Sequence, residues 1–199
     1  MRICVFAGSK SGWHRDYERM ARALGRELVE RGMGLVYGGA RRGVMGALAD
    51  EVIALGGEVI GVIPRGLWPS EEDHPQVTRH EVRDLQERKA VMMELADAFV
   101  VLPGGLGTID EVFEVLVSRQ LGLHPKPVGL LNALGYFDPL KLLIEHAIDQ
   151  GFVSLNASFH LEVEDAEALF LEAAEVDVLL DRLMCVMCQR KGSVVWSAR

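Results

Sequence analysis

Short apolar runs typical of β-strands alternate with amphipathic segments of helical length along most of this chain of 199 residues. The runs in the middle of the chain are almost wholly apolar, as expected for strands that are buried on both faces. Because parallel strands are joined by helical crossovers, the alternation predicts a parallel sheet covered by helices. The expected strands are Arg2–Ala7, Gly34–Tyr37, Glu58–Ile63, Val77–Glu81, Ala98–Leu102, Pro127–Leu131 and His160–Val163.

The segments between these strands predict helices, and glycines directly after several of them support their ends. The expected helices are Trp13–Arg31, Val44–Leu55, Leu85–Ala96, Thr108–Leu121, Pro139–Gln150 and Ala166–Leu183. The predicted fold class is therefore α/β, a Rossmann-like, doubly wound, mostly parallel sheet of about seven strands with helices on both faces. We expect a single domain over residues 1–183, an exposed loop at Leu67–Gln76 and a mobile C-terminal tail over residues 184–199.

The charge and composition of the chain argue against several classes of function. The formal net charge of −8 argues against broad binding to nucleic acid, because phosphate backbones are held by basic surfaces. Neither a membrane helix nor a signal peptide is predicted, so we expect a cytoplasmic protein that does not bind membranes. The three cysteines, an odd number, suit a reducing compartment. Cys185 and Cys188 form a C-x-x-C pair, but no second pair follows at zinc spacing, so no metal site is expected.

Three glycine-rich segments directly follow predicted strands, at Ala7–Gly12, Tyr37–Gly46 and Pro103–Glu111. In an open parallel sheet, ligands bind beyond the carboxyl ends of the strands. Glycine lets backbone N–H groups approach a ligand closely, and a helix that starts next adds unpaired amides and a positive dipole end. These features together predict a phosphate-binding site, although the segments match neither the dinucleotide-binding motif nor the P-loop. A tight turn would explain each segment alone, but three in succession favour a ligand.

Charged residues in two predicted helices are candidates for chemistry. Arg88 falls inside the apolar stripe of its helix, where a guanidinium needs a carboxylate or phosphate partner unless it extends from the stripe's edge into water. Lys89 lies on the other side of the stripe, where extension into water is favoured. Glu111 fits a capping box with Thr108 and shares a polar face with Glu114, so a solvated face explains its position as well as a catalytic role does. The residues alone leave the role of Glu111 open.

Four motifs together resemble the LONELY GUY (LOG) family of cytokinin-activating phosphoribohydrolases, once widely labelled lysine decarboxylases. The family signature P-G-G-x-G-T-x-x-E is intact at Pro103–Glu111, and the family's R-K pair is present at Arg88–Lys89. The glycine turn Gly38–Gly46 and the segment Gly135–Leu140 are also similar to family motifs. The resemblance covers residues 3 to about 163, roughly four-fifths of the chain.

The chain departs from the family pattern at a few positions. Gln86 and Ala40 stand where the family usually has histidine and glycine, and the pair Arg41–Arg42 is more basic than the usual pattern. The positions that match the family's catalytic and phosphate-binding motifs are all retained.

The resemblance implies hydrolysis of the N-glycosidic bond of a nucleoside 5′-monophosphate, AMP or N6-prenylated AMP, to free base and ribose 5-phosphate. It implies a homodimer and no cofactor, with Glu111 and Arg88 as the catalytic groups. The implied substrate-binding residues are Gly8, Ser9, Gly39, Lys89, Gly104, Gly105, Leu106, Gly107 and Thr108. The main alternative is a non-catalytic carrier of a nucleotide or molybdenum cofactor on the same fold. A pyridoxal-dependent decarboxylase is disfavoured, because none of the five lysines has the setting of a Schiff-base residue.

Overall fold

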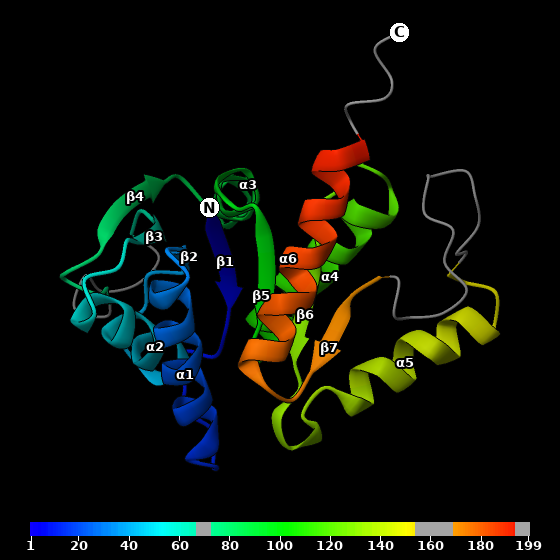
Figure 1. Cartoon of the computed structure of the whole chain (residues 1–199), viewed down its shortest axis with the longest axis horizontal. Helices are drawn as coiled ribbons and strands as arrows, with labels where there is room; N and C mark the ends of the chain where they lie inside the picture. The colour runs from blue at the N-terminus through cyan, green and yellow to red at the C-terminus, as the bar shows by residue number, and fades with distance from the viewer. Residues whose placement is uncertain (67–72, 154–168, 194–199) are drawn as a thin grey trace, which may run out of the picture.

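A seven-stranded sheet, parallel throughout, runs through the centre of the protein, with helices on both faces (Figure 1). The computed structural model describes residues 1–66, 73–153 and 169–193. The strand order is β4-β3-β2-β1-β5-β6-β7. The strands are β1 (Arg2–Phe6), β2 (Gly34–Tyr37), β3 (Val59–Pro64), β4 (Thr78–Val82), β5 (Ala98–Val101), β6 (Val128–Leu131) and β7 (Leu171–Ala173). The predicted α/β class and parallel sheet are confirmed.

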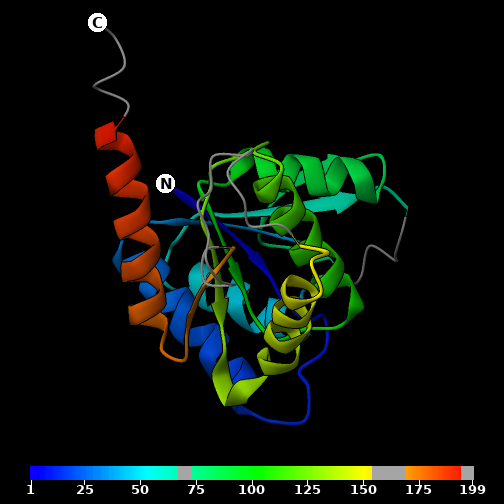
Figure 2. The same cartoon turned by 90° about the vertical axis from the view of Figure 1, so that its right-hand side faces the viewer.

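Two hydrophobic cores lie on opposite faces of this sheet. The helices are α1 (Asp16–Glu30), α2 (Gly43–Ala54), α3 (Leu85–Leu95), α4 (Leu106–Gln120), α5 (Asp138–Asp149) and α6 (Val176–Ser193), with a short 3-10 turn, η2 (Ala133–Gly135). Alternate residues of β1 point to opposite faces, so Ile3 and Val5 pack under α1, α2 and α6, whereas Cys4 and Phe6 pack under α3, α4 and α5. Figure 2 shows α1 and α6 on one side of the sheet and α4 and α5 on the other.

The strand order reverses beside β1. From β1 the chain moves outward through β2 and β3 to β4, and it then returns to place β5 against the other side of β1. Phe6 is the register partner of Val101, and Leu102 N–H donates to the Phe6 carbonyl over 2.9 Å, so the loops after β1 and β5 start at the same level. Connections that diverge from adjacent strand ends leave a crevice between them, which is where open α/β sheets bind ligands.

The end of the chain differs from the sequence prediction. Residues 171–173, predicted as part of the helix Ala166–Leu183, form strand β7, so that part of the prediction is wrong. The composition of this Leu-Glu-Ala segment favours a helix, but pairing with β6 at the sheet edge overrides so short a local preference. Helix α6 also continues to Ser193, ten residues past the predicted end at Leu183. The predicted strand His160–Val163 lies outside the described residues.

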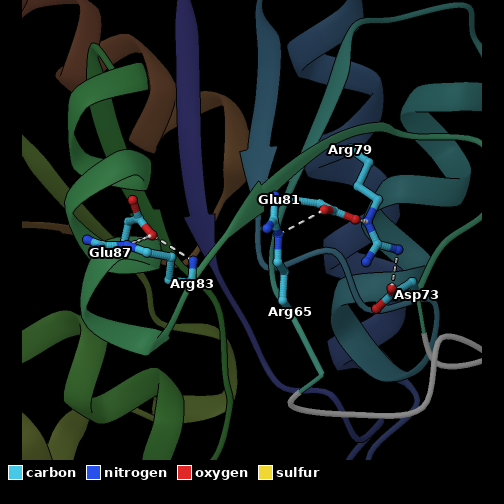
Figure 3. A network of polar contacts seen from close by, with 6 residues as sticks. All are labelled: Arg65, Asp73, Arg79, Glu81, Arg83 and Glu87. Atoms are coloured by element: carbon cyan, nitrogen blue, oxygen red, sulfur yellow. Dashed lines mark hydrogen bonds and ion pairs between the residues drawn. The ribbon is translucent and has the colours of Figure 1, made fainter.

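The edge strand β4 carries a network of charged side chains, which Figure 3 shows. Arg79 pairs with Asp73 at 2.7 Å and with Glu81 at 3.0 Å, and Arg65 pairs with the same Glu81 at 3.1 Å. Charged edge strands discourage pairing with other sheets. The segment that precedes β4 also folds back on the second glycine turn, because His74 N–H donates to the Gly39 carbonyl over 2.9 Å. No described helix is long and apolar enough to span a membrane.

Candidate active site

A pocket of about 510 Å³ opens where β1, β2 and β5 end. The three glycine-rich turns that follow these strands line it, together with side chains from α1, α3 and α4. Most of the residues predicted to form the site lie in its wall: Gly8, Ser9, Arg88, Gly104, Gly105, Leu106, Gly107, Thr108 and Glu111. Gly39 and Lys89 lie outside this lining. The crevice at the switch point of the sheet therefore brings together residues that are more than a hundred positions apart in the chain.

The turns after β1 and β5 pack against each other so closely that only glycine fits at Gly104. A Cβ atom there would lie 2.1 Å from Thr108 Oγ1 and 2.7 Å from the backbone nitrogen of Gly8. Gly8 N–H in turn donates to the Pro103 carbonyl over 3.1 Å. The backbones of both turns are therefore presented to the pocket without intervening side chains.

Helix α4 starts directly at the pocket. Its N-cap residue is Gly105, which has no side chain to accept from the first amides of the helix. These amides have no partner within the helix, and the helix dipole makes this end positive. The predicted capping box with Thr108 as N-cap is wrong, because Thr108 lies inside the first turn and is buried. The start of α4 is thus suited to bind an anion such as a phosphate group.

Arg88 and Glu111 form a buried ion pair in the wall of this pocket, which we call the inner pair. The distance from Arg88 Nη2 to Glu111 Oε1 is 3.2 Å, and their side chains are only 9% and 12% exposed. The prediction that Arg88 is buried with a carboxylate partner is confirmed. Gly38 makes room for it, because a Cβ at Gly38 would lie 2.1 Å from Arg88 Nη2. Arg88 Nε is buried without a hydrogen-bond partner among the described residues, so the guanidinium retains capacity to bind a further group.

The environment of the inner pair changes the protonation of Glu111. Burial raises the pKa of Glu111 to about 7, although the neighbouring positive charge of Arg88 lowers it, and Asp110 adds a smaller increase. A carboxyl group with a pKa near neutrality is able to take up and release a proton under physiological conditions, as general acids and bases do. The pocket therefore combines a turn suited to bind an anion with a carboxyl group able to exchange a proton near neutral pH.

On the outer side of the same two helices, Lys89 of α3 forms ion pairs with two carboxylates of α4. We call these contacts of Lys89 together the outer pair. Lys89 contacts Asp110 at 3.2 Å and also Glu114, and Asp110 is 65% exposed. The hydrogen bond to Glu114 and the smaller contribution of Asp110 raise the pKa of Lys89. Lys89 is thus held against α4, away from the pocket.

Two tyrosines in the pocket wall had no role assigned from the sequence. Tyr17 and Tyr136 meet edge to face with ring centroids 5.8 Å apart, and the Tyr136 hydroxyl donates to the Gly104 carbonyl. The segment Gly135–Leu140 resembles a family motif, but the sequence did not indicate which residue Tyr136 would reach. In the described part of the chain, no three His, Cys, Asp or Glu side chains lie together as a metal ion would require.

The fold and the site define the class of this protein, a Rossmann-like α/β protein with its ligand pocket at the switch point of the sheet. Solved structures share this fold. The molybdenum cofactor binding protein from Rippkaea orientalis matches with a TM-score of 0.67 and 20% identity, over 94% of this chain and 96% of that one. The molybdenum cofactor carrier protein from Chlamydomonas reinhardtii matches with a TM-score of 0.66 and 21% identity, over 94% of this chain and 98% of that one. Identities this low establish the fold alone.

Sequence comparisons define the family. A family described as possible lysine decarboxylase matches residues 45–173. Cytokinin riboside 5′-monophosphate phosphoribohydrolase LOG from Oryza sativa subsp. japonica is 42% identical over 196 residues, which are 98% of this chain and 77% of that protein. The phosphoribohydrolase LOG3 from Arabidopsis thaliana is 46% identical over 199 residues, which are 99% of this chain and 93% of that protein. The chain belongs to this LOG family, as the motifs in its sequence predicted.

Proposed function

We propose that this protein hydrolyses the N-glycosidic bond of a nucleoside 5′-monophosphate, AMP or N6-prenylated AMP, and releases the free base and ribose 5-phosphate. The names of its relatives support this reaction. The observation that carries the proposal is a buried carboxyl group, Glu111, whose pKa is raised to about 7, in the same pocket as a helix start that has no side-chain cap. The reaction consumes only water, so the proposal requires no cofactor.

The 5′-phosphate would bind at the start of α4. The free amides of residues 105–108 and the positive end of the helix dipole attract an anion, and Thr108 adds a hydroxyl group. Gly8 and Ser9, in the turn after β1 that packs against the turn after β5, would border the nucleotide from the adjacent part of the pocket wall. Gly39 and Lys89 lie outside the pocket lining, and they remain proposed binding residues because the matching family motifs contain them.

Glu111 would act on the anomeric carbon. As the bond between C1′ and the base nitrogen breaks, positive charge develops on the ribose, which a nearby carboxylate stabilises. The same carboxylate is able to accept a proton from the attacking water, whose oxygen forms the new bond to C1′, while the base nitrogen gains a proton. Arg88 would orient Glu111 through the ion pair, and its unpartnered Nε is available for the ribose or the phosphate.

We also propose that the protein is a cytoplasmic homodimer whose second subunit completes the base pocket. Leu106, the first residue of α4 and part of the pocket wall, is 86% exposed in the single chain. In the proposed dimer, the second subunit would pack on the start of α4 and cover this side chain. The three cysteines are free thiols, which suits a reducing compartment. Sedimentation that shows only monomer at micromolar concentration would contradict the dimer.

The test is a panel of nucleoside 5′-monophosphates that includes AMP, GMP, CMP, UMP and N6-prenylated AMP. Free base and ribose 5-phosphate are measured by chromatography, with adenosine as the matched substrate that lacks a phosphate group. We expect release of both products from at least one monophosphate and none from adenosine. A carrier protein would bind a nucleotide without releasing base, so binding without product across the panel would favour that alternative and refute the hydrolase.

A further inference from the structure

The loop after β6 has an unusual backbone. Leu134 and Gly135 both adopt positive φ, at 57° and 67°, and Leu134 is the one non-glycine residue to do so within the described residues. This conformation costs a non-glycine residue about 1 to 2 kcal/mol. The Leu134 side chain is 59% exposed, so its own packing does not compensate for that cost. The contacts that offset this strain must therefore be made by neighbouring residues of the loop.

The loop is held in one conformation by Asn132. Its Oδ1 accepts from Phe137 N–H over 2.7 Å, and its Nδ2 donates to Asp138 at 2.7 Å and to Glu172 at 2.6 Å. The Asn132 backbone N–H donates to the Ala173 carbonyl of β7 over 2.8 Å. Residues 132–138 are thus fixed to the sheet at both β6 and β7, and Tyr136 projects from a rigid frame.

Tyr136 reaches from this frame to the anion-binding turn. Its hydroxyl donates to the Gly104 carbonyl, and its ring packs edge-on against Tyr17 and Phe137, with centroids 5.8 and 5.0 Å away. The carbonyl of Gly104 and the N–H of Gly105 belong to one planar peptide unit and point in opposite directions. Fixing the carbonyl therefore fixes the direction of the first free amide at the start of α4. Without that contact, the neighbouring glycines would leave the peptide free to turn.

From these contacts we propose that Tyr136 is a positioning residue, which aims the Gly105 amide at the phosphate group of the substrate. The proposal rests on the proposed function only in taking a phosphate ester as the ligand of this turn. Tyr136 would act through the Gly104 peptide rather than touch the anomeric carbon. Its loss should therefore weaken binding of phosphate-bearing ligands and leave the chemical step nearly unchanged.

The test compares Tyr136→Phe, which removes only the hydroxyl, with Leu134→Asn, a matched control in the same loop. Asn adopts positive φ more readily than Leu, so the control should keep the loop and the hydrogen bond. For Tyr136→Phe we expect the Kd for ribose 5-phosphate and the KM for AMP to rise about tenfold, the loss typical of one hydrogen bond. We expect kcat to change less than about threefold. Leu134→Asn should leave all three values unchanged.

A second measurement follows the Gly105 amide directly. In ¹H–¹⁵N spectra, this resonance should shift on titration of the wild-type protein with ribose 5-phosphate and shift less in folded Tyr136→Phe. A fall in kcat at unchanged KM, unchanged ribose 5-phosphate affinity in Tyr136→Phe, or no binding of ribose 5-phosphate by the wild-type protein would each overturn the role of Tyr136. If the wild-type protein binds ribose 5-phosphate but releases no base from any nucleotide, the proposed hydrolysis fails while this titration still tests Tyr136.

Discussion

The inner pair and the outer pair join the same two helices, yet their surroundings differ sharply. Arg88 and Glu111 face the pocket with side chains 9% and 12% exposed, whereas Asp110 and Glu114 of the outer pair are 65% and 30% exposed. Adjacent helical residues point about 100° apart, so one step in sequence moves a carboxylate from the pocket wall to the solvent. Burial raises the pKa of Glu111, because a charged carboxylate is costly where water is excluded. The two ion pairs therefore differ in exposure to water, and the proposed function assigns chemistry only to the buried one.

The largest expected effect is a loss of activity when the carboxylate of the inner pair, but not one of the outer pair, is replaced. We expect Glu111→Gln to lower kcat for base release by about 10²- to 10⁴-fold, because the amide no longer exchanges the proton. The matched change on the same helix, Glu114→Gln, should keep kcat within about twofold, because Glu114 contacts Lys89 outside the pocket. Both variants are assayed at saturating AMP. Equal losses of kcat in the two variants would contradict a catalytic role that is specific to Glu111.

The next effect is a larger loss of stability when the cation of the inner pair is removed than when the cation of the outer pair is removed. Arg88→Ala leaves Glu111 buried without its ion-pair partner, so at pH 8 the free energy of unfolding should fall by about 3 kcal/mol. Lys89→Ala removes contacts to two partly exposed carboxylates and should cost at most about 1 kcal/mol. Urea unfolding at pH 8 and again at pH 6 measures both. The Arg88→Ala loss should shrink at pH 6 as Glu111 becomes protonated, and a loss independent of pH would contradict this explanation.

Much of the fold was predictable because its signals are local. The apolar runs predicted six of the seven described strands, and the glycine turns indicated the edge of the sheet at which the pocket lies. Strand β7 was missed because three residues of helix-favouring composition become a strand only through pairing with β6. The extent of α6 was missed because the helix continues past Leu183 with Met184 and Met187 packed against the hydrophobic core, a tertiary contact that local periodicity does not show.

Among the charged residues of the site, Arg88 alone was indicated by a conflict between the residue and its surroundings. Arg88 inside an apolar stripe indicated a buried partner, and the structure supplies Glu111. The helical periodicity placed Lys89 on the other side of that stripe. It could not predict the contacts of Lys89 with Asp110 and Glu114, because these depend on the packing of α4 against α3. The contact of Tyr136 with Gly104 spans 32 residues and depends on the strained turn at Leu134, so no local pattern reveals it.

A smaller effect concerns the dependence of stability on pH. The pKa of Glu111 rises from 4.5 to about 7 on folding, so between these values the folded protein binds a proton that the unfolded chain releases. Stability due to this group is therefore present below pH 4.5 and is lost as the pH rises through about 7. Glu111→Gln has no such loss and should be more stable than the wild-type protein by up to about 3 kcal/mol at pH 8. Near pH 4.5 the two should match, and a constant difference from pH 4.5 to pH 8 would exclude this cause.

The smallest effect tests whether the outer pair influences the inner one. The negative charge of Asp110 contributes to the raised pKa of Glu111, although Asp110 itself is 65% exposed. Asp110→Asn should therefore change the free energy of unfolding by less than about 0.5 kcal/mol, yet move the acid limb of kcat/KM to lower pH by roughly a few tenths of a unit. Salt screens charges near the surface, so this shift should diminish at about 1 M sodium chloride, where the Debye length is about 3 Å. An unshifted acid limb at low salt would mean that the charge of Asp110 does not reach Glu111, and that burial and Arg88 dominate the pKa of Glu111.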